Sequence, residues 1–347
     1  MTNAEIIHHL RSLVKGGRCD APEMREILLA HCCFYLAQKT ALAPIDRLSE
    51  ITSAVTVKER FKQAKPLFES LRSTPYAVVK GAVLSERIYR SPFVRRSGDL
   101  DILLRREDLD FAKQVLLDAG FVQGRIVNGK IEPFTRKELI FQASQSHQTA
   151  PFVKATNNKV CPFVNLDLNT SIFWGEYKHP CNMDLVLRET EEANLFEIPF
   201  KKLAPEMEFI SLCLHHYKDM NSIYLLSKGS LKLCLFSDIL YYLKNVELNM
   251  DKLASSGAAL GANRYLYYCL WYTDAVFDDD CLKPYLRRFE SAEGKALLDC
   301  FGLEEGERCP WTMDLWERLF SPSFCEQFYS SLTERDIEKI KMNETLM

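Results

Sequence analysis

Two acidic residues, Asp99 and Asp101, flank a single leucine at the start of the run Asp-Leu-Asp-Ile-Leu-Leu. The apolar end of this run predicts a strand, in which successive side chains point to opposite faces. Both carboxylates then lie on one face, roughly 6–7 Å apart along the strand. Two carboxylates this close repel each other unless a divalent cation lies between them. Because Mg²⁺ prefers one or two carboxylates together with phosphate oxygens, the pair predicts a site for magnesium and a triphosphate.

Upstream of this pair, Gly81 lies where a predicted strand, residues 76–79, turns into a predicted helix, residues 82–90. A residue without a Cβ lets backbone N–H groups approach a phosphate, and the helix N-terminus adds a favourable dipole. Lys80 and Arg95 can supply positive charge to the same anion. The sequence therefore predicts a phosphate-binding turn beside the two acids.

A third acid, Asp167, occurs in the run Val-Asn-Leu-Asp-Leu-Asn, which predicts a separate strand. A site that holds two metal ions about 3.5–4 Å apart needs a further carboxylate of this kind. We therefore expect Asp99, Asp101 and Asp167 to share Mg²⁺ and to form the catalytic group.

Helices and strands must position these residues, and periodicity predicts both. Helices are expected where apolar residues recur every three or four positions, at 2–14, 22–42, 46–72 (with a kink or break at Pro66), 206–219, 231–244, 249–260 and 261–276. Strands are expected at 76–79, 99–104, 163–168, 183–188 and 194–200, with a β-meander over 121–175. The predicted fold class is α+β, with a small mixed sheet in a core of residues 75–204, an N-terminal helical region at 1–74 and a C-terminal helical domain at 205–347.

One stretch of the sequence, Lys80-Gly-x-x-Leu, Tyr89, Pro92 and then Arg-x-Ser-Gly-Asp-x-Asp, resembles a known family. It is similar to little-characterised bacterial nucleotidyltransferases of the DNA polymerase beta superfamily. That resemblance implies a glycine after the first strand, paired acids on the second and a third acid on a later strand. It extends weakly to Leu212-Cys-Leu-His-His and to Asp238, so that it covers about residues 74–245.

The resemblance also implies further nucleotide-binding residues. Ser97 and Gly98 belong to its loop motif, and His216 and Asp238 belong to its helical half. Alternatives remain open for several positions: solvated acids on a strand, a structural salt bridge for Lys80, a structural helical histidine, and an Asp238 that caps a helix or pairs with Lys232.

The expected activity is transfer of a nucleoside monophosphate from a triphosphate, ATP in the first instance, to a hydroxyl of a small molecule or peptide, with release of pyrophosphate. Two alternatives stay open. One is a protein AMP-transferase, and the other is a catalytically inactive module that binds a nucleotide or a partner.

The composition of the chain indicates which classes of partner and which cellular compartment to expect. The formal net charge is −3 and the pI is about 6.2, which gives no reason to expect nucleic-acid binding. No run approaches the roughly 18 apolar residues of a membrane span, and the N-terminus lacks the apolar core of a secretion signal. The 12 cysteines include no Cys-x-x-Cys pair, so we expect free thiols in a reducing cytoplasm.

Overall fold

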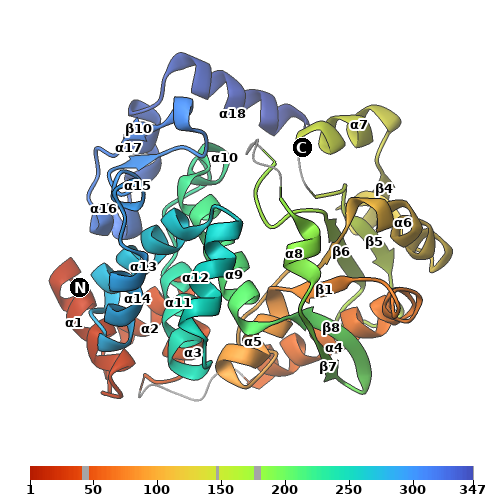
Figure 1. The fold of residues 1–347 in the computed structure, drawn as a ribbon, viewed down its shortest axis with the longest axis horizontal. Helices are drawn as coiled ribbons and strands as arrows, with labels where there is room; N and C mark the ends of the chain where they lie inside the picture. Colours follow the sequence, from red (N-terminus) through yellow and green to blue (C-terminus); the bar gives the residue numbers. More distant parts are fainter. Residues whose placement is uncertain (41–46, 146–147, 176–180, 347) are drawn as a thin grey trace. The chain divides into compact units, whose positions relative to one another are not determined.

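A computed structural model describes residues 1–40, 47–145, 148–175 and 181–346 (Figure 1). The chain forms two compact units, one of residues 44–208 and one of residues 1–43 together with 209–347. This division differs from the three regions expected from the sequence, because the first 43 residues share a unit with the C-terminal helices. Among the described residues, no helix is long and apolar enough to cross a membrane.

The unit of residues 44–208 contains an eight-stranded mixed sheet with the order β4-β3-β5-β6-β2-β1-β8-β7. Its strands are β1 (Tyr76–Val79), β2 (Leu100–Leu104), β3 (Val122–Val127), β4 (Lys130–Pro133), β5 (Phe152–Ala155), β6 (Phe163–Asn169), β7 (Thr190–Leu195) and β8 (Ile198–Leu203). The β2–β6 and β1–β8 pairs are parallel and the others antiparallel. The sheet is mixed, as expected, but larger than the small sheet predicted, because a hairpin extends each edge.

Helices of the same unit are α4 (Arg47–Ser70), α5 (Gly81–Tyr89), η1 (Arg106–Asp108), α6 (Leu109–Asp118), α7 (Arg136–Gln145) and α8 (Met183–Leu187). The strand predicted at 183–188 is wrong, because the Asn182 side chain accepts a hydrogen bond from the Leu185 N–H and caps a helix there. Helix α7 interrupts the predicted meander. A reciprocal pair of contacts between Thr135 and Glu138 starts it, which is the capping-box pattern.

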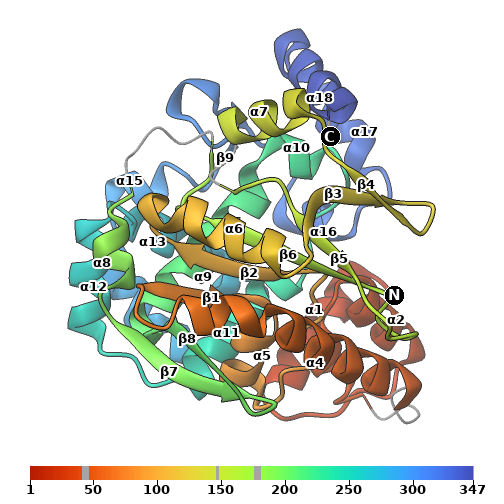
Figure 2. The same cartoon turned by 90° about the vertical axis from the view of Figure 1, so that its right-hand side faces the viewer.

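Helices α4 and α6 pack side by side on one face of the sheet (Figure 2). The sequence predicts a kink or a break at Pro66, and the break is wrong, because α4 continues through this residue as one helix. Pro66 is exposed, so the carbonyl that it leaves without an intrahelical partner is on the solvent side of the helix.

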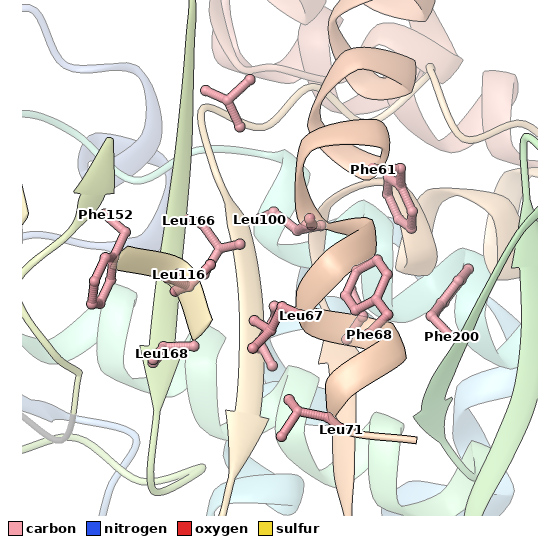
Figure 3. Packing of buried hydrophobic residues seen from close by; sticks show 14 of the residues in the cluster. Phe61, Leu67, Phe68, Leu71, Leu100, Leu116, Phe152, Leu166, Leu168 and Phe200 are labelled. Carbon is pink, nitrogen blue, oxygen red and sulfur yellow. The ribbon is translucent and has the colours of Figure 1, made fainter. Parts of the chain in front are cut away.

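The core of this unit lies between these helices and the sheet. Phe61, Leu67, Phe68 and Leu71 of α4 point toward the strands, as Figure 3 shows. They meet alternate strand residues, among them Leu100, Ile102 and Leu104 of β2 and Val164, Leu166 and Leu168 of β6. Because side chains alternate along a strand, the residues between these buried apolar residues lie on the opposite face of the sheet. That face holds the predicted acids.

The second unit is helical. Its elements are α1 (Asn3–Val14), α2 (Pro22–Ala30), α3 (Phe34–Ala37), most of α9 (Pro205–Asn221), α10 (Ile223–Leu226), α11 (Cys234–Asn245), α12 (Met250–Ala259), α13 (Asn263–Phe277), η2 (Asp280–Leu282), α14 (Lys283–Phe289), α15 (Ala292–Lys295), η3 (Glu305–Glu307), α16 (Leu315–Phe320), α17 (Phe324–Ser330) and α18 (Glu334–Leu346), with a two-stranded ladder of β9 (Cys300–Phe301) and β10 (Cys309–Pro310). Tyr265 and Tyr268 of α13 are buried against Tyr217 of α9, which makes the tyrosine-rich run part of the core.

Candidate active site

Two neighbouring parallel strands bring the three predicted acids together. Asp101 of β2 lies directly opposite Asp167 of β6 in the strand register, and Asp99 comes just before β2. Strands in a sheet are about 4.8 Å apart, so the two side chains are neighbours on the face away from the core. Asp101 is 7% exposed and Asp167 is 5% exposed. The site therefore contains buried acids rather than solvated acids at a sheet edge.

The acids have strongly perturbed electrostatics. Burial, and then the charges of Asp99 and Asp101, raise the pKa of Asp167 to about 8. Burial and the neighbouring Asp101 also raise the pKa of Asp99. These directions mean that, without a metal ion, the site favours the protonated form of both carboxyls.

Side-chain oxygens without partners gather on the same face of β6. Within the described part of the chain, one oxygen each of Asn165, Asp167 and Asn169 is buried and accepts no hydrogen bond. Carboxylate and amide oxygens are the ligands that hard divalent cations prefer. The unpaired oxygens and the raised carboxyl pKa values both fit a bound Mg²⁺ at this place.

The turn between β1 and α5 has an unusual backbone. Lys80 has φ 57° and ψ −153°, and Gly81, the first residue of α5, has φ +42°. The conformation of Lys80 is costly for a residue with a side chain, and such strain is often found at functional sites. The Lys80 ammonium lies 3.3 Å from an Asp101 carboxylate oxygen. The turn therefore places one cation against the acids and the N-terminus of α5 beside them.

Ser97 connects this turn to the loop before β2. A Cβ at Gly81 would come within 2.9 Å of the Ser97 Oγ, so the close approach requires glycine. The Ser97 hydroxyl donates to the carbonyl oxygen of Asp99 at 3.1 Å. In this structure Ser97 positions the segment that leads to Asp99.

A family of proteins described as uncharacterised nucleotidyltransferases matches residues 29–278 of the 347. The chain belongs to this nucleotidyltransferase family. The match covers the whole sheet unit and, of the helical unit, the helices α3 and α9 to α13. The match rests on the sequence of residues 29–278 and is independent of the distances between the acids.

We also compared the chain with curated proteins and with solved structures. Comparison with curated proteins gives no significant match. Among solved structures, an antigenic nucleotidyltransferase-like protein from Paracoccidioides brasiliensis is similar to the chain at 17% identity, covering 68% of this chain and 100% of its own, with a TM-score of 0.32.

One cation close to the three acids was not predicted from the sequence. Arg60 of α4 is 8% exposed and donates to the Ser97 carbonyl oxygen at 2.7 Å and to its hydroxyl at 3.3 Å. Burial lowers its pKa, and the nearby Asp99 partly offsets that shift. No local pattern distinguishes Arg60 from the other basic residues of α4, because its partners lie 37 residues further along the chain.

Asn169 was also missed, although a signal for it was available. Its side-chain amide donates to an Asp101 carboxylate oxygen at 3.1 Å. Asn169 is two residues after Asp167 on one strand, so alternation puts both on the same face. Only the pairing of β6 with β2 shows that its partner is Asp101.

The remaining loop residues have less defined surroundings. Arg95 is half-buried, and its backbone N–H donates to the buried Ser85 hydroxyl at 2.9 Å. Gly98 is exposed, and a Cβ there would meet no described atom within 4 Å. Fold packing therefore does not require glycine at 98, whereas it does at 81.

The two residues predicted from the helical half lie in the other unit. His216 of α9 is 1% exposed and Asp238 of α11 is 2% exposed. The His216 Nε2 lies 3.7 Å from an Asp238 carboxylate oxygen. The two side chains are thus neighbours in the helical unit, and their contact with a nucleotide stays a prediction.

Proposed function

We propose that the chain transfers a nucleoside monophosphate from a nucleoside triphosphate, ATP in the first instance, to a hydroxyl group, with Mg²⁺ as the required ion. The observation that supports this most is the clustering of three acids: Asp101 and Asp167 are buried and Asp99 comes directly before β2, and burial and neighbouring acids raise the pKa of Asp99 and of Asp167. A carboxylate group of this kind has no evident role in stability, because burying like charges together destabilises a fold.

The three aspartates would hold Mg²⁺, and the amides of Asn165 and Asn169 line the same face of β6. Bound there, Mg²⁺ would neutralise phosphate charge and lower the pKa of the acceptor hydroxyl. Asn169 keeps the Asp101 carboxylate oriented through its 3.1 Å hydrogen bond. Arg60 bonds to Ser97, and the Ser97 hydroxyl bonds to the backbone of Asp99, so the two residues help to position Asp99.

The turn at Gly81 would receive the β- and γ-phosphates. Unpaired N–H groups at the start of a helix attract anions, and α5 begins at Gly81. Lys80 and Arg95 would add positive charge, with Ser97 and Gly98 in the adjoining loop. The acceptor oxygen then attacks the α-phosphorus, the bond from that phosphorus to the pyrophosphate oxygen breaks, and the hydroxyl proton passes to water.

The acceptor in this proposal is a small molecule or a peptide. A net charge of −3 and a pI of about 6.2 do not provide the basic surface that nucleic-acid backbones require. All 12 cysteines are free thiols in the structure, which supports a reducing, cytoplasmic setting.

Labelled ATP tests the proposal. Incubation with ATP labelled at the α-phosphorus and Mg²⁺ in the presence of candidate acceptors should move label to an acceptor, while ATP labelled at the γ-phosphorus should yield labelled pyrophosphate. Asp101→Asn should lower turnover by orders of magnitude, because it removes a ligand charge without changing volume. Asp110→Asn is the matched control, since Asp110 is 94% exposed on α6. Equal turnover in wild type and Asp101→Asn would contradict the assignment.

A further inference from the structure

A second group of ionisable side chains lies in the helical unit, in a place the proposed reaction does not use. His215, His216 and Asp219 project from α9, and their ligand atoms all lie within 4.8 Å of one another. Asp219 is four residues after His215 and three after His216, and both spacings place side chains next to each other on a helix, so Asp219 brings the three together. The group contains two imidazoles, unlike the all-oxygen group on the sheet.

His216 is the member with the most unusual surroundings. It is 1% exposed, and neither of its ring nitrogens has a hydrogen-bond partner among the described residues. Asp238 of α11 approaches the ring to 3.7 Å, which is too far for a hydrogen bond. A buried imidazole with both nitrogens unsatisfied is destabilising, so a ligand bound to one of them would remove the cost.

The other two members already have nearly the spacing of metal ligands. The His215 Nε2 lies 3.4 Å from an Asp219 carboxylate oxygen, and both side chains are partly exposed. In a tetrahedral zinc site, ligand atoms about 2.0–2.2 Å from the ion are about 3.3–3.6 Å from each other. Lys218 approaches the other Asp219 oxygen at 3.7 Å, so the oxygen that faces His215 is not the one that faces the lysine.

We propose that His215, His216 and Asp219 bind one divalent transition-metal ion, Zn²⁺ in the first instance. Neutral imidazoles and a carboxylate suit zinc, whereas Mg²⁺ selects oxygen ligands. Asp238 lies beside the ring of His216 and would orient it, as carboxylates next to ligating histidines do. The ion would bind the His216 ring that otherwise has no hydrogen-bond partner and would stabilise the helical unit, independently of the reaction proposed for the sheet.

The test is calorimetric titration of the full-length, chelator-treated protein with Zn²⁺ in the presence of excess Mg²⁺, which occupies oxygen-only sites. We expect one equivalent of zinc to bind and the melting temperature to rise. His215→Ala and Asp219→Asn should each weaken binding at least tenfold. His8→Ala is the matched control, because the His8–His9 rings are 5.7 Å apart, the same separation as the His215–His216 rings, but are not part of this cluster.

Two additional measurements distinguish zinc bound at this cluster from zinc bound elsewhere on the chain. Asp101→Asn should bind zinc like wild type, since Asp101 lies in the other unit. Replacing zinc with Co²⁺ should give the visible absorption of a tetrahedral site in wild type and lose it in His216→Ala, with circular dichroism confirming the fold. If His216→Ala does not fold, Asp219→Asn decides, because its side chain is 26% exposed. No zinc binding by wild type, or binding unchanged in both His215→Ala and Asp219→Asn, would overturn the proposal.

Discussion

Asp167 has a carboxyl pKa of about 8, against an ordinary value of 3.8, because it is buried beside two other acids. Between these two values the folded protein holds a proton that the unfolded chain has released. Stability of the metal-free protein should therefore fall as pH rises from about 4 to about 8. Each unit of pKa difference corresponds to about 1.4 kcal/mol, so we expect the melting temperature in chelator to fall by several degrees.

Asp167→Asn is the variant that checks this prediction. An amide does not titrate, so the variant should lose most of the dependence on pH and should be more stable than wild type at pH 8. Added Mg²⁺ should raise the melting temperature of wild type at pH 8 more than that of the variant. A wild-type melting temperature that rises steadily over this pH range would contradict the electrostatic description of the site.

A second prediction at the residue scale concerns the contribution of Lys80 and Arg95 to triphosphate binding. Lys80→Ala and Arg95→Ala should each remove a charge-assisted contact to phosphate, worth about 1.5–3 kcal/mol. At about 1.4 kcal/mol per tenfold, triphosphate affinity should fall roughly ten- to a hundredfold, and less at high salt. Titration with ATP and Mg²⁺ measures this. Unchanged affinity in both variants would place the phosphates away from the turn.

Single residues differ in how far the sequence could predict them. Strand alternation alone is enough to put Asp99 and Asp101 together, and a third acid on an apolar strand could be selected as Asp167. The contact of Asn169 with Asp101 depends on strand pairing, and Arg60 reaches Ser97 from a helix far earlier in the chain. Such long-range contacts leave no local pattern, so both residues were found only in the structure.

The strand–turn–helix element formed by β1, Lys80 and α5 gives a prediction at the next scale. Gly81→Ala should lower the free energy of unfolding by about 1–2 kcal/mol, because φ is +42° and the new Cβ meets the Ser97 Oγ. Gly98→Ala is the matched control and should change stability by no more than about 0.5 kcal/mol, since its Cβ would meet open space. Chemical denaturation measures both.

The variants Gly81→Ala and Gly98→Ala also distinguish an effect on folding from an effect on ligand binding. If Gly98 serves the nucleotide, Gly98→Ala should weaken triphosphate binding while leaving the unfolding curve unchanged. A large destabilisation by Gly98→Ala together with none by Gly81→Ala would show that the turn is formed differently.

Elements with strong periodicity were predictable, and those set by local capping were not. Periodicity predicted α1, β6 and α13 with bounds close to those observed. The segment 183–188 is apolar and short, so periodicity could not separate a strand from a helix, and the Asn182 cap settles it as α8. The size of the sheet depends on which hairpins pair at its edges, which no single segment shows.

At the scale of the whole molecule, charge gives a prediction about partners. With a net charge of −3, the protein should not bind labelled single- or double-stranded oligonucleotides at micromolar concentration and physiological salt. Fluorescence anisotropy measures this, with ATP and Mg²⁺ present and absent. Tight binding whose affinity falls steeply with salt would instead indicate a nucleic-acid acceptor.

The central claim is that the three aspartates and the N-terminus of α5 form one site for a metal ion and a triphosphate. A crystal of the protein soaked with Mn²⁺ and a non-hydrolysable ATP analogue tests it most directly, because manganese is located by its anomalous scattering. We predict manganese bound by Asp99, Asp101 and Asp167, and the β- and γ-phosphates at the backbone of Gly81. Manganese elsewhere, or a triphosphate bound away from this turn, would contradict the account.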